Sequence, residues 1–591
     1  MNLKILTISI SVVIVIIAVT FLLIEIQGKG PPVETGSTPP QAPKESTSQD
    51  LATELGFPEG YNAEFLLKPE LLSPLFIAAT SDDQLLVAEH YGDRLLRINP
   101  LTAEIDVLYN LPHEQYVWNA LVSDGADGAY MQIMGQIAHI SGNGTYTAYY
   151  PHLMNPAALG PNGEIYGFTN SDVLVLQSKD EGPKTIATGF SMIADLVRDK
   201  EGNLYVSDWD MGTITRIKPD GTKQLLSSAL NQKDPIELGF SPNGTLYVDE
   251  GIGKFSQIDT DTGSLKRIDW FGGSESIHPT DFTFLSNGKA YFVDPTHNNI
   301  MRVDLQKKEV ELVIRGGGNS RALDVGPDGA VYIGDNNGYP FYRSRILRIQ
   351  NNSVEVYADN LDAITDLSFA PNGNMFVTAK YLGETGEYRG SSVLLITPTH
   401  EVKTLVFWDR DIPGARTVWS ISVDPKTGVA VAYDQGNSEL ISIDEDGNVS
   451  LLPNSFSFDT IQSVYIDYAP DGALYAIETN KKDFETGPLV ERNIIRFDEN
   501  GNPIIITDFN HIGSSTTDNI AIAPDGTIYA LGYKLVSNDM SLWRITDNGE
   551  KILLSDKLPI DPLSVASDSE GNIYVACSAG LMRIWKENNT A

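Results

Sequence analysis

One short pattern recurs along the chain and limits what the chain can fold into. It is a tight turn of the Pro-Asn-Gly or Pro-Asp-Gly type, followed by a run in which apolar and aromatic residues alternate. Such turns supply the positive φ values of a tight hairpin, and the alternation is typical of a half-buried β-strand. Clear copies are PNGEIYGF at 161, EGNLYVSDW at 201, PNGTLYVDE at 242, SNGKAYFVD at 286, PDGAVYIGD at 327, PNGNMFVTA at 371, PDGALYAIE at 470, PDGTIYALG at 524 and EGNIYVACS at 570; divergent copies are SDDQLLVAE at 81, DGADGAYMQ at 124 and PKTGVAVAY at 425. The pattern predicts an all-β chain of twelve similar units.

The size of the repeated unit indicates its architecture. Successive turn glycines are mostly about 35 to 55 residues apart, the size of a four-stranded propeller blade. The third residue after the turn glycine is aromatic in nine copies, at Tyr166, Tyr205, Tyr247, Tyr291, Tyr332, Phe376, Tyr475, Tyr529 and Tyr574. An aromatic side chain that recurs at one register predicts packing between neighbouring sheets rather than a cofactor site.

The segment GNLYVSDWDMGTITRIKPDG, residues 202–221, resembles the repeat of a known superfamily. This repeat is shared by NHL, SMP-30 gluconolactonase-like and streptogramin-lyase-like six-bladed β-propellers. The resemblance extends from about residue 60 to the end of the chain. It implies a propeller fold without selecting a function, because the superfamily contains lactonases, phosphotriesterases, lyases and binding modules.

The twelve blades are predicted to form two tandem six-bladed propellers, propeller 1 at residues 59–316 and propeller 2 at 317–591. A single twelve-bladed ring is the alternative. The sequence ends after the third strand of the twelfth blade, and two strands are left over, Ala63–Lys68 and Glu309–Ile314. We expect the first to complete blade 6 and the second to complete blade 12, because both exposed sheet edges are then covered.

The N-terminal region has a different composition. An uncharged apolar run, Ile5–Ile24, follows Lys4 and is long enough to cross a bilayer as a helix. Residues 1–27 are therefore predicted to be an uncleaved transmembrane anchor, with a cleaved signal peptide as the alternative. The position of Lys4 places the rest of the chain outside the cytoplasm, as a single-pass membrane protein or, after cleavage, a secreted one. Residues 28–58, rich in Pro, Gly, Ser and Thr, are predicted to be a flexible linker.

Charge and cysteine content exclude several classes of function. The 42 basic and 78 acidic residues give a net charge of −36, which disfavours nucleic acid and anionic membrane surfaces as partners. The single cysteine, Cys577, excludes an internal disulfide framework and a cysteine-based zinc site.

Alignment of the blades on the turn glycine places polar residues near the starts of the innermost strands of propeller 1. They are Asn119, Asn155, Asp195, Glu237 and Asp281. Carboxylate and amide oxygens are the ligands of hard cations, and the order Asn, Asn, Asp is similar to part of the calcium set of the lactonase and phosphotriesterase propellers. The resemblance implies Ca²⁺ or another divalent cation as cofactor. However, the blade 1 segment SPLFIAATSDD lacks the glutamate of those families. Polar caps around channel water are the alternative.

Two histidines, His152 and His278, precede innermost strands of propeller 1 and are candidate general bases. Streptogramin-lyase-like propellers use a histidine with a magnesium ion, so His278 beside Asp281 is the nearest match to that chemistry. A loop histidine without a catalytic role is the alternative.

Acidic residues also recur just after the second strand of seven blades, at Glu89, Asp208, Asp249, Asp294, Asp335, Asp434 and Glu478. Repetition at one register predicts that they cap backbone N–H groups and are structural.

Propeller 2 carries long insertions between its second and third strands, at 336–345, 380–390, 479–493 and 532–540. Their aromatic residues are Tyr339, Phe341, Tyr342, Tyr381, Tyr388, Phe484 and Tyr533. Aromatic residues on loops over a rigid scaffold are typical of protein and carbohydrate recognition. Packing within their own loops is the alternative.

Two functions follow from these features. The first is a membrane-tethered extracytoplasmic module that binds a protein or carbohydrate ligand through the loops of propeller 2. The second is a calcium-dependent, SMP-30/gluconolactonase-like lactonase or esterase with its site in the channel mouth of propeller 1. The absence of the blade 1 glutamate favours the binding module.

Overall fold

The structure is a computed structural model that describes residues 47–591 except 68–69, 90–93, 112–120, 134–135, 149–153, 178–181, 229, 231–236, 251–253, 269–279, 296–297, 317–321, 337–342, 352, 384–387, 453–460, 481–488, 491, 499–500, 509–510, 513–518, 534–539, 547, 559–561, 578–579 and 587–591. The predicted anchor at 1–27 and most of the predicted linker lie outside these residues. In the described part, no helix combines the length and apolar composition needed to span a membrane.

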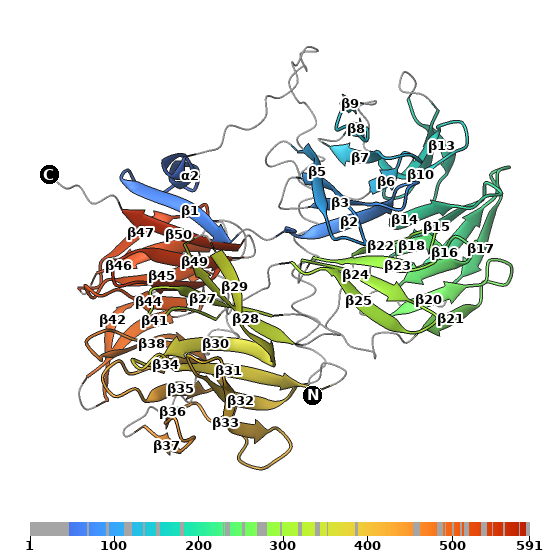
Figure 1. Cartoon of the computed structure of the whole chain (residues 1–591). Coiled ribbons are helices and arrows are strands. Elements are labelled where there is room, and N and C mark those ends of the chain that lie inside the picture. Colours follow the sequence, from blue (N-terminus) through green and yellow to red (C-terminus); the bar gives the residue numbers. More distant parts are fainter. Residues whose placement is uncertain are drawn as a thin grey trace. The chain divides into compact units, whose positions relative to one another are not determined.

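The described strands form twelve four-stranded antiparallel sheets, six in each propeller, which confirms the predicted fold class (Figure 1). The blades of propeller 1 run from β2 (Pro74–Ala79) to β5 (Ile105–Asn110), β6 (Leu121–Ser123) to β9 (Tyr146–Ala148), β10 (Asn155–Leu159) to β13 (Lys184–Ala187), β14 (Ile193–Arg198) to β17 (Lys223–Ser227), β18 (Glu237–Phe240) to β21 (Leu265–Ile268) and β22 (Asp281–Phe284) to β25 (Glu309–Ile314). They are blades 1 to 6.

In propeller 2, blades 7 to 11 run from β26 (Leu323–Val325) to β29 (Ser353–Leu361), β30 (Ala363–Phe369) to β33 (Val402–Asp409), β34 (Val418–Val423) to β37 (Val449–Leu451), β38 (Ile461–Tyr468) to β42 (Pro503–Asp508) and β44 (Asn519–Ile522) to β47 (Lys551–Ser555). Blade 12 contains β48 (Pro562–Ser567), β49 (Ile573–Cys577) and β50 (Gly580–Lys586). A short pair, β40 (Leu489–Val490) with β43 (His511–Ile512), stands apart from the blades. The innermost strand of each blade lies beside that of the next.

Propeller 1 closes without a strand from elsewhere in the chain. Each of its six blades consists of four consecutive strands, and β2 of blade 1 lies beside β22 of blade 6. The N–H of Ile77 donates to Oδ2 of Asp281 at 2.9 Å, and the hydroxyl of Thr280 donates to the carbonyl of Leu75 at 2.8 Å. Side chains and core packing therefore join the first blade to the last.

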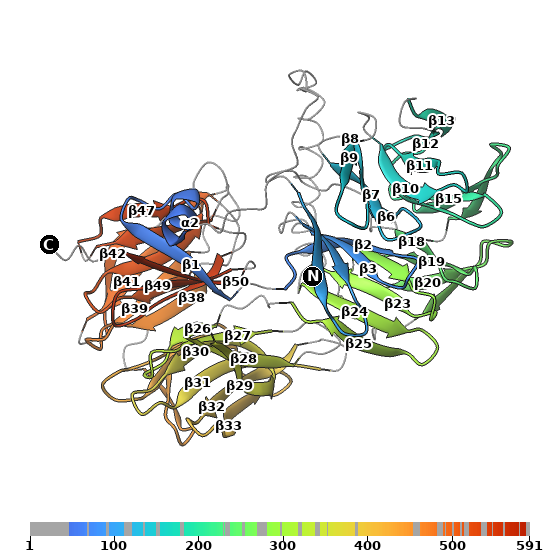
Figure 2. The ribbon, with the colours of Figure 1, turned by 45° about the horizontal axis from the view of Figure 1, so that its top comes forward.

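Propeller 2 is closed by the N-terminal strand β1 (Tyr61–Leu67), which pairs antiparallel with β50 from Tyr61↔Lys586 to Leu67↔Leu581. In Figures 1 and 2 the blue strand β1 lies along the red strand β50. The predicted closure was therefore wrong for both spare strands. β1 completes blade 12. β25 completes blade 6 because a tight hairpin at Asp304↔Glu309 joins it to the strand before it.

The recurrent aromatic residue packs between sheets as predicted, and in six blades it faces an arginine on the third strand. Cα partners include Tyr205↔Arg216, Tyr332↔Arg348 and Tyr574↔Arg583. Tyr205, Tyr332 and Tyr574 are buried, and each hydroxyl donates to an acid of its own turn at 2.9–3.1 Å. This explains why the aromatic residue is so often tyrosine.

Candidate functional site

The innermost strand of each blade leaves one row of backbone N–H groups facing the neighbouring blade. In propeller 2, three carboxyl groups accept these N–H groups across the gap. Oδ2 of Asp324 accepts from Phe369 at 3.1 Å, Oδ2 of Asp366 from Ile421 at 2.9 Å, and Oδ2 of Asp467 from Ile522 at 3.0 Å. Each carboxyl therefore fastens its own blade to the next.

Hydroxyl and amide oxygens do the same at other blades of propeller 2. Oγ of Ser368 accepts from Val423 at 3.1 Å, Oγ of Ser420 from Ile466 at 3.1 Å, Oγ of Ser422 from Tyr468 at 2.9 Å, and Oδ1 of Asn519 from Val565 at 3.3 Å. These acceptors recur at two positions before the turn, for example five and seven residues before Gly373 at Ser368 and Asp366. The channel wall is thus lined by two tiers of polar side chains.

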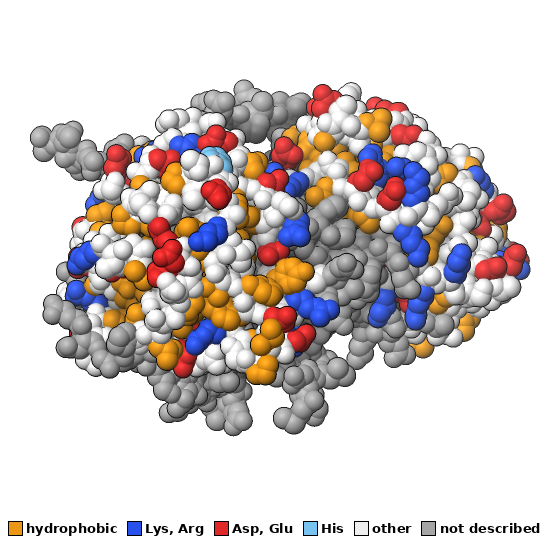
Figure 3. All heavy atoms as spheres, turned by 60° about the horizontal axis from the view of Figure 1, so that its bottom comes forward, with side chains coloured by type: hydrophobic (Ala, Val, Ile, Leu, Met, Phe, Trp, Pro, Cys, Tyr) orange, Lys and Arg blue, Asp and Glu red, His pale blue; other side chains and the backbone are white. Residues whose placement is uncertain are grey.

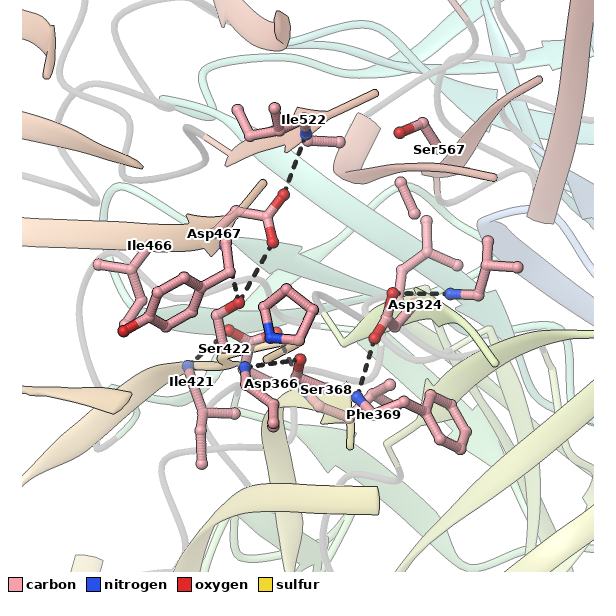
Figure 4. A pocket seen from close by; sticks show the side chains of 18 of the residues that line it. Asp324, Asp366, Ser368, Phe369, Ile421, Ser422, Ile466, Asp467, Ile522 and Ser567 are labelled. Atoms are coloured by element: carbon pink, nitrogen blue, oxygen red, sulfur yellow. Dashed lines mark hydrogen bonds between the residues drawn. The ribbon is translucent and has the colours of Figure 1, made fainter. Parts of the chain in front are cut away.

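A cavity of about 390 Å³ lies within these tiers, and Asp324, Asp366 and Asp467 line it (Figure 4). Burial raises the pKa of Asp324 to about 6. Burial, with a smaller contribution from Asp324, raises the pKa of Asp366 to about 7. Burial followed by repulsion from Asp324 and Asp366 raises the pKa of Asp467 to about 8. The three groups therefore share the channel in a mixture of protonation states near neutral pH.

In propeller 1 the structure brings together three of the predicted metal ligands. Asp195, Glu237 and Asp281 come from blades 4, 5 and 6 and line a cavity of about 300 Å³. Burial raises the pKa of Asp195 to about 6. Burial first, and then neighbouring carboxylates, raise the pKa values of Glu237 and Asp281 well above the usual range.

Two of these three carboxyls already have backbone partners. Oδ1 and Oδ2 of Asp195 accept from Leu196 at 2.6 Å and Leu238 at 2.8 Å. Those of Asp281 accept from Phe282 at 2.7 Å and Ile77 at 2.9 Å. The carboxyl of Glu237 makes no hydrogen bond to any residue that the structure describes. Asp195 and Asp281 thus fasten blades together in propeller 1 as the acids of propeller 2 do.

The predicted calcium set is not assembled by the described residues. Among them, no three His, Cys, Asp or Glu side chains are grouped so that they could hold a metal ion. Blade 3 lines the cavity with Pro156 and Ala157, and Asn155 is not among the described lining residues. Asn119, His152 and His278 lie outside the described residues. The calcium site therefore stays a prediction of the sequence.

Three of the acids at the ends of the second strands, Glu89, Asp208 and Asp434, cap backbone N–H groups as predicted, whereas the carboxyl of Asp335 contacts the guanidinium groups of Arg315 and Arg345 at 3.3 and 2.5 Å. Asp208 accepts from Ser191 at 2.7 Å and from Met192 and Met211 at 3.2 Å. Asp434 accepts from Thr417 at 3.0 Å and Gly436 at 3.1 Å. Both carboxyls are buried. Their role is to hold the loops on either side of the strand.

Of the predicted loop aromatics, Tyr339, Phe341, Tyr342 and Phe484 lie outside the described residues, and so does the side chain of Tyr533. Tyr381 and Tyr388 belong to a hairpin in blade 8 formed by β31 (Met375–Leu382) and β32 (Tyr388–Ile396). The hydroxyl of Tyr388 bonds to Oγ of Ser391 at 2.7 Å and donates to Oγ1 of Thr417, just before blade 9, at 3.4 Å, so it is tied to its own blade and to the next one. Tyr381 is 39% exposed and stands edge-on to Phe407, which is 47% exposed, with 5.8 Å between ring centroids.

The sequence analysis did not predict Asp324 and Asp467 in the cavity of propeller 2, or Phe407 in the aromatic pair of blade 8. Asp324 and Asp467 lie five residues before Gly329 and Gly472, a register that the strand-start alignment did not consider. Phe407 lies on the outer strand β33 rather than in a loop. Alignment of every blade at both polar registers would have found the two aspartates.

No protein-family model matches the sequence, and no curated protein matches it. The structure is similar to a streptogramin B lyase, with 17% identity and a TM-score of 0.34 over 46% of this chain and 94% of that one. It is also similar to PorZ, a surface component of the type-IX secretion system of Porphyromonas gingivalis, with 11% identity and a TM-score of 0.46 over 88% and 86%. A third likeness is to the extracellular domain of a hybrid two-component system from B. thetaiotaomicron, with 11% identity and a TM-score of 0.32 over 90% and 82%. The β-propeller fold that the sequence resemblance implied is shown by the twelve four-stranded sheets themselves.

Proposed function

We propose that the chain is an extracytoplasmic binding module, held at the membrane by its N-terminal segment, that recognises a protein or carbohydrate ligand through blade 8. The observation that carries the proposal is the exposed aromatic pair of Tyr381 and Phe407. Aromatic side chains provide a large contact area at a low cost in conformational entropy, and they are enriched in recognition surfaces.

The backbone that carries this pair supports the proposal because it is paired into a sheet. Tyr381 pairs with Gly390, and Gly390 pairs with Asp409, so three strands hold the aromatic pair from below. A Cβ on Gly390 would lie 2.3 Å from the carbonyl oxygen of Trp408 and 3.2 Å from the ring of Phe407. The glycine therefore leaves room for the Phe407 ring to lie against the hairpin.

Charged and apolar groups also lie on the strands that carry the aromatic pair and in the turn after β33. Arg389, beside Gly390, forms an exposed ion pair with Asp411 at 3.8 Å. Ile412 follows and is 61% exposed. An apolar centre with a charged rim is the usual composition of a recognition surface.

Binding of the purified full-length chain to a glycan array and to a displayed peptide library tests the proposal. Tyr381→Ala and Phe407→Ala are each expected to weaken binding of the selected ligand roughly tenfold or more. Leu225→Ala is the control, because Leu225 is 61% exposed on an outer strand of propeller 1. Binding that survives both aromatic substitutions, or that is lost with Leu225→Ala, contradicts the proposal.

The lactonase alternative is supported by one observation, the Glu237 carboxyl without a described hydrogen-bond partner in the cavity of propeller 1. On this alternative, the full-length chain with added calcium hydrolyses simple lactones, and EDTA or Glu237→Gln abolishes turnover. Asp444→Asn, at a partly exposed turn residue of propeller 2, is the control that keeps activity. Absence of turnover on a lactone and ester panel leaves the binding module.

A further inference from the structure

The chain leaves propeller 2 after β1 and returns to it at β26, and these two points lie next to each other. Leu66 and Leu67, at the end of β1, pack on a core cluster that contains Leu323 of blade 7 and Leu581 of blade 12. Leu323 opens β26, the first strand after the chain returns. The exit and the re-entry therefore share one hydrophobic cluster.

The two ends of propeller 1 also meet. Leu71, its first buried residue, and Ile314, the last residue of β25, belong to one cluster with Leu285 and Val293 of blade 6. The N–H of Ser73 donates to Oδ1 of Asn298 at 2.7 Å in the same region. A domain that tolerates insertion into another domain has its two ends close together and supplies all of its own strands, as propeller 1 does.

The segment that precedes this departure is fixed to propeller 2. It consists of α2 (Ser48–Glu54) and β1, and we call residues 48–67 the latch. Ala52, Leu55 and Phe57 are buried in one cluster with residues of blades 11 and 12. Oγ of Ser555 donates to the carbonyl of Leu55 at 2.5 Å. Both halves of the latch thus pack on propeller 2.

We infer that propeller 1 is a cassette inserted into propeller 2, and that the latch ties the N-terminal segment to propeller 2 alone. The two segments that connect propeller 1 to propeller 2 link the rings covalently, but they supply no strand to propeller 2. Cutting both of them releases propeller 1 as a closed ring and leaves the N-terminal fragment bound to propeller 2.

The test uses the full-length chain with a specific protease sequence inserted after Lys68 and a second one in place of residues 317–320. After both cuts, size-exclusion chromatography under native conditions is expected to separate propeller 1 from a complex of the other two fragments. Single-site variants are the controls, and each should elute as one species. Elution of the N-terminal fragment with propeller 1, or separation into three fragments, overturns the inference.

Paired cysteines test the same point in the uncut chain. Ala63 and Ile584 are Cα partners, so Ala63→Cys with Ile584→Cys is expected to form a disulfide. The matched control joins Ala63→Cys with Met301→Cys, on the third strand of blade 6, where the strand would pair if it closed propeller 1. Cross-linking in the control pair, or its absence in the first pair, overturns the inference even if the cleavable variants fail to fold.

Discussion

The carboxyls of Asp324, Asp366 and Asp467 accept backbone N–H groups of the next blade in a cavity without a described basic side chain. Among the described residues that line the cavity of propeller 2, none is Lys or Arg. Burial raises the pKa of Asp324 to about 6, and burial together with a smaller repulsion raises the pKa values of Asp366 and Asp467 to about 7 and about 8. An acid with a raised folded-state pKa contributes stability that is fully present below the unfolded-state pKa. That contribution is lost as the pH rises through the folded-state value.

We expect Asp467→Asn to reduce this loss of stability as the pH rises. An amide carries no charge, and its Oδ1 can still accept the N–H of Ile522. The unchanged chain is expected to lose stability between about pH 4 and about pH 8, by an amount on the order of a few kcal/mol, and the variant to lose less. Calorimetric melting across this range measures the difference.

Asp444→Asn is the control for this experiment. Asp444 is partly exposed, and a hydrogen bond from Asn448 lowers its pKa, so its contribution is lost only as the pH falls. Its substitution should leave the loss between about pH 4 and about pH 8 unchanged. Equal losses over this range in the unchanged chain and in Asp467→Asn would refute the assignment of the effect to Asp467.

Single residues also show what the sequence could predict about the sites. The turn glycines and their tyrosines predicted the twelve blades, because both act within one hairpin. The sequence also predicted Asp195 and Asp281 at the channel, but as metal ligands. Their role depends on the stagger between neighbouring blades, which brings an N–H of the next strand, that of Leu238 or Ile77, to each carboxyl. No sequence pattern within a single repeat indicates this stagger.

Among the elements, β1 closes propeller 2, since it supplies the fourth strand of blade 12. The sequence predicted correctly that blade 12 lacks a fourth strand of its own. It could not tell which spare strand would fill the gap, because Ala63–Lys68 and Glu309–Ile314 are both short strands without a turn signal. The hairpin at Asp304↔Glu309 pairs β25 with the preceding strand of blade 6, so β1 is the strand that completes blade 12.

We expect Ala63→Asp to destabilise propeller 2 and to leave propeller 1 unchanged. Ala63 is fully buried in the cluster beneath β1, so an aspartate there loses hydration without gaining a partner. The cost is roughly 2–4 kcal/mol. Hydrogen exchange should rise in β48 to β50 and stay unchanged in β22 to β25.

Glu64→Ala is the matched control on the same strand. The Glu64 side chain is partly exposed and lies 3.6 Å from Arg583, so its removal should cost less than about 0.5 kcal/mol. Increased exchange in blade 6 after Ala63→Asp would mean that β1 belongs to propeller 1 after all.

At the scale of the whole molecule, the net charge of −36 opposes compactness. On the face shown in Figure 3, acidic and basic side chains are interspersed and do not gather into one patch. The excess of acidic residues in the sequence therefore acts as general self-repulsion and not through one acidic patch on this face.

We expect added salt to raise the melting temperature. An increase in NaCl from about 20 mM to about 150 mM shortens the range of repulsion, and a gain of about 1 kcal/mol corresponds to roughly 2–4 °C for bodies of this size. KCl at equal ionic strength should have the same effect. A much larger gain with CaCl₂ at equal ionic strength would indicate specific cation binding instead of screening.

The pairing of β1 with β50 also sets the order in which the molecule can be completed during synthesis. Tyr61 is made about 500 residues before its partner Lys586. At roughly 5–20 residues per second, the intervening stretch of about 500 residues takes roughly half a minute to two minutes to emerge. Propeller 1 has all its strands once Ile314 is made, so it can finish folding during this interval. The edge and apolar face of β1 stay uncovered until the last blade arrives, which makes an interrupted chain prone to aggregation through its N-terminal strand.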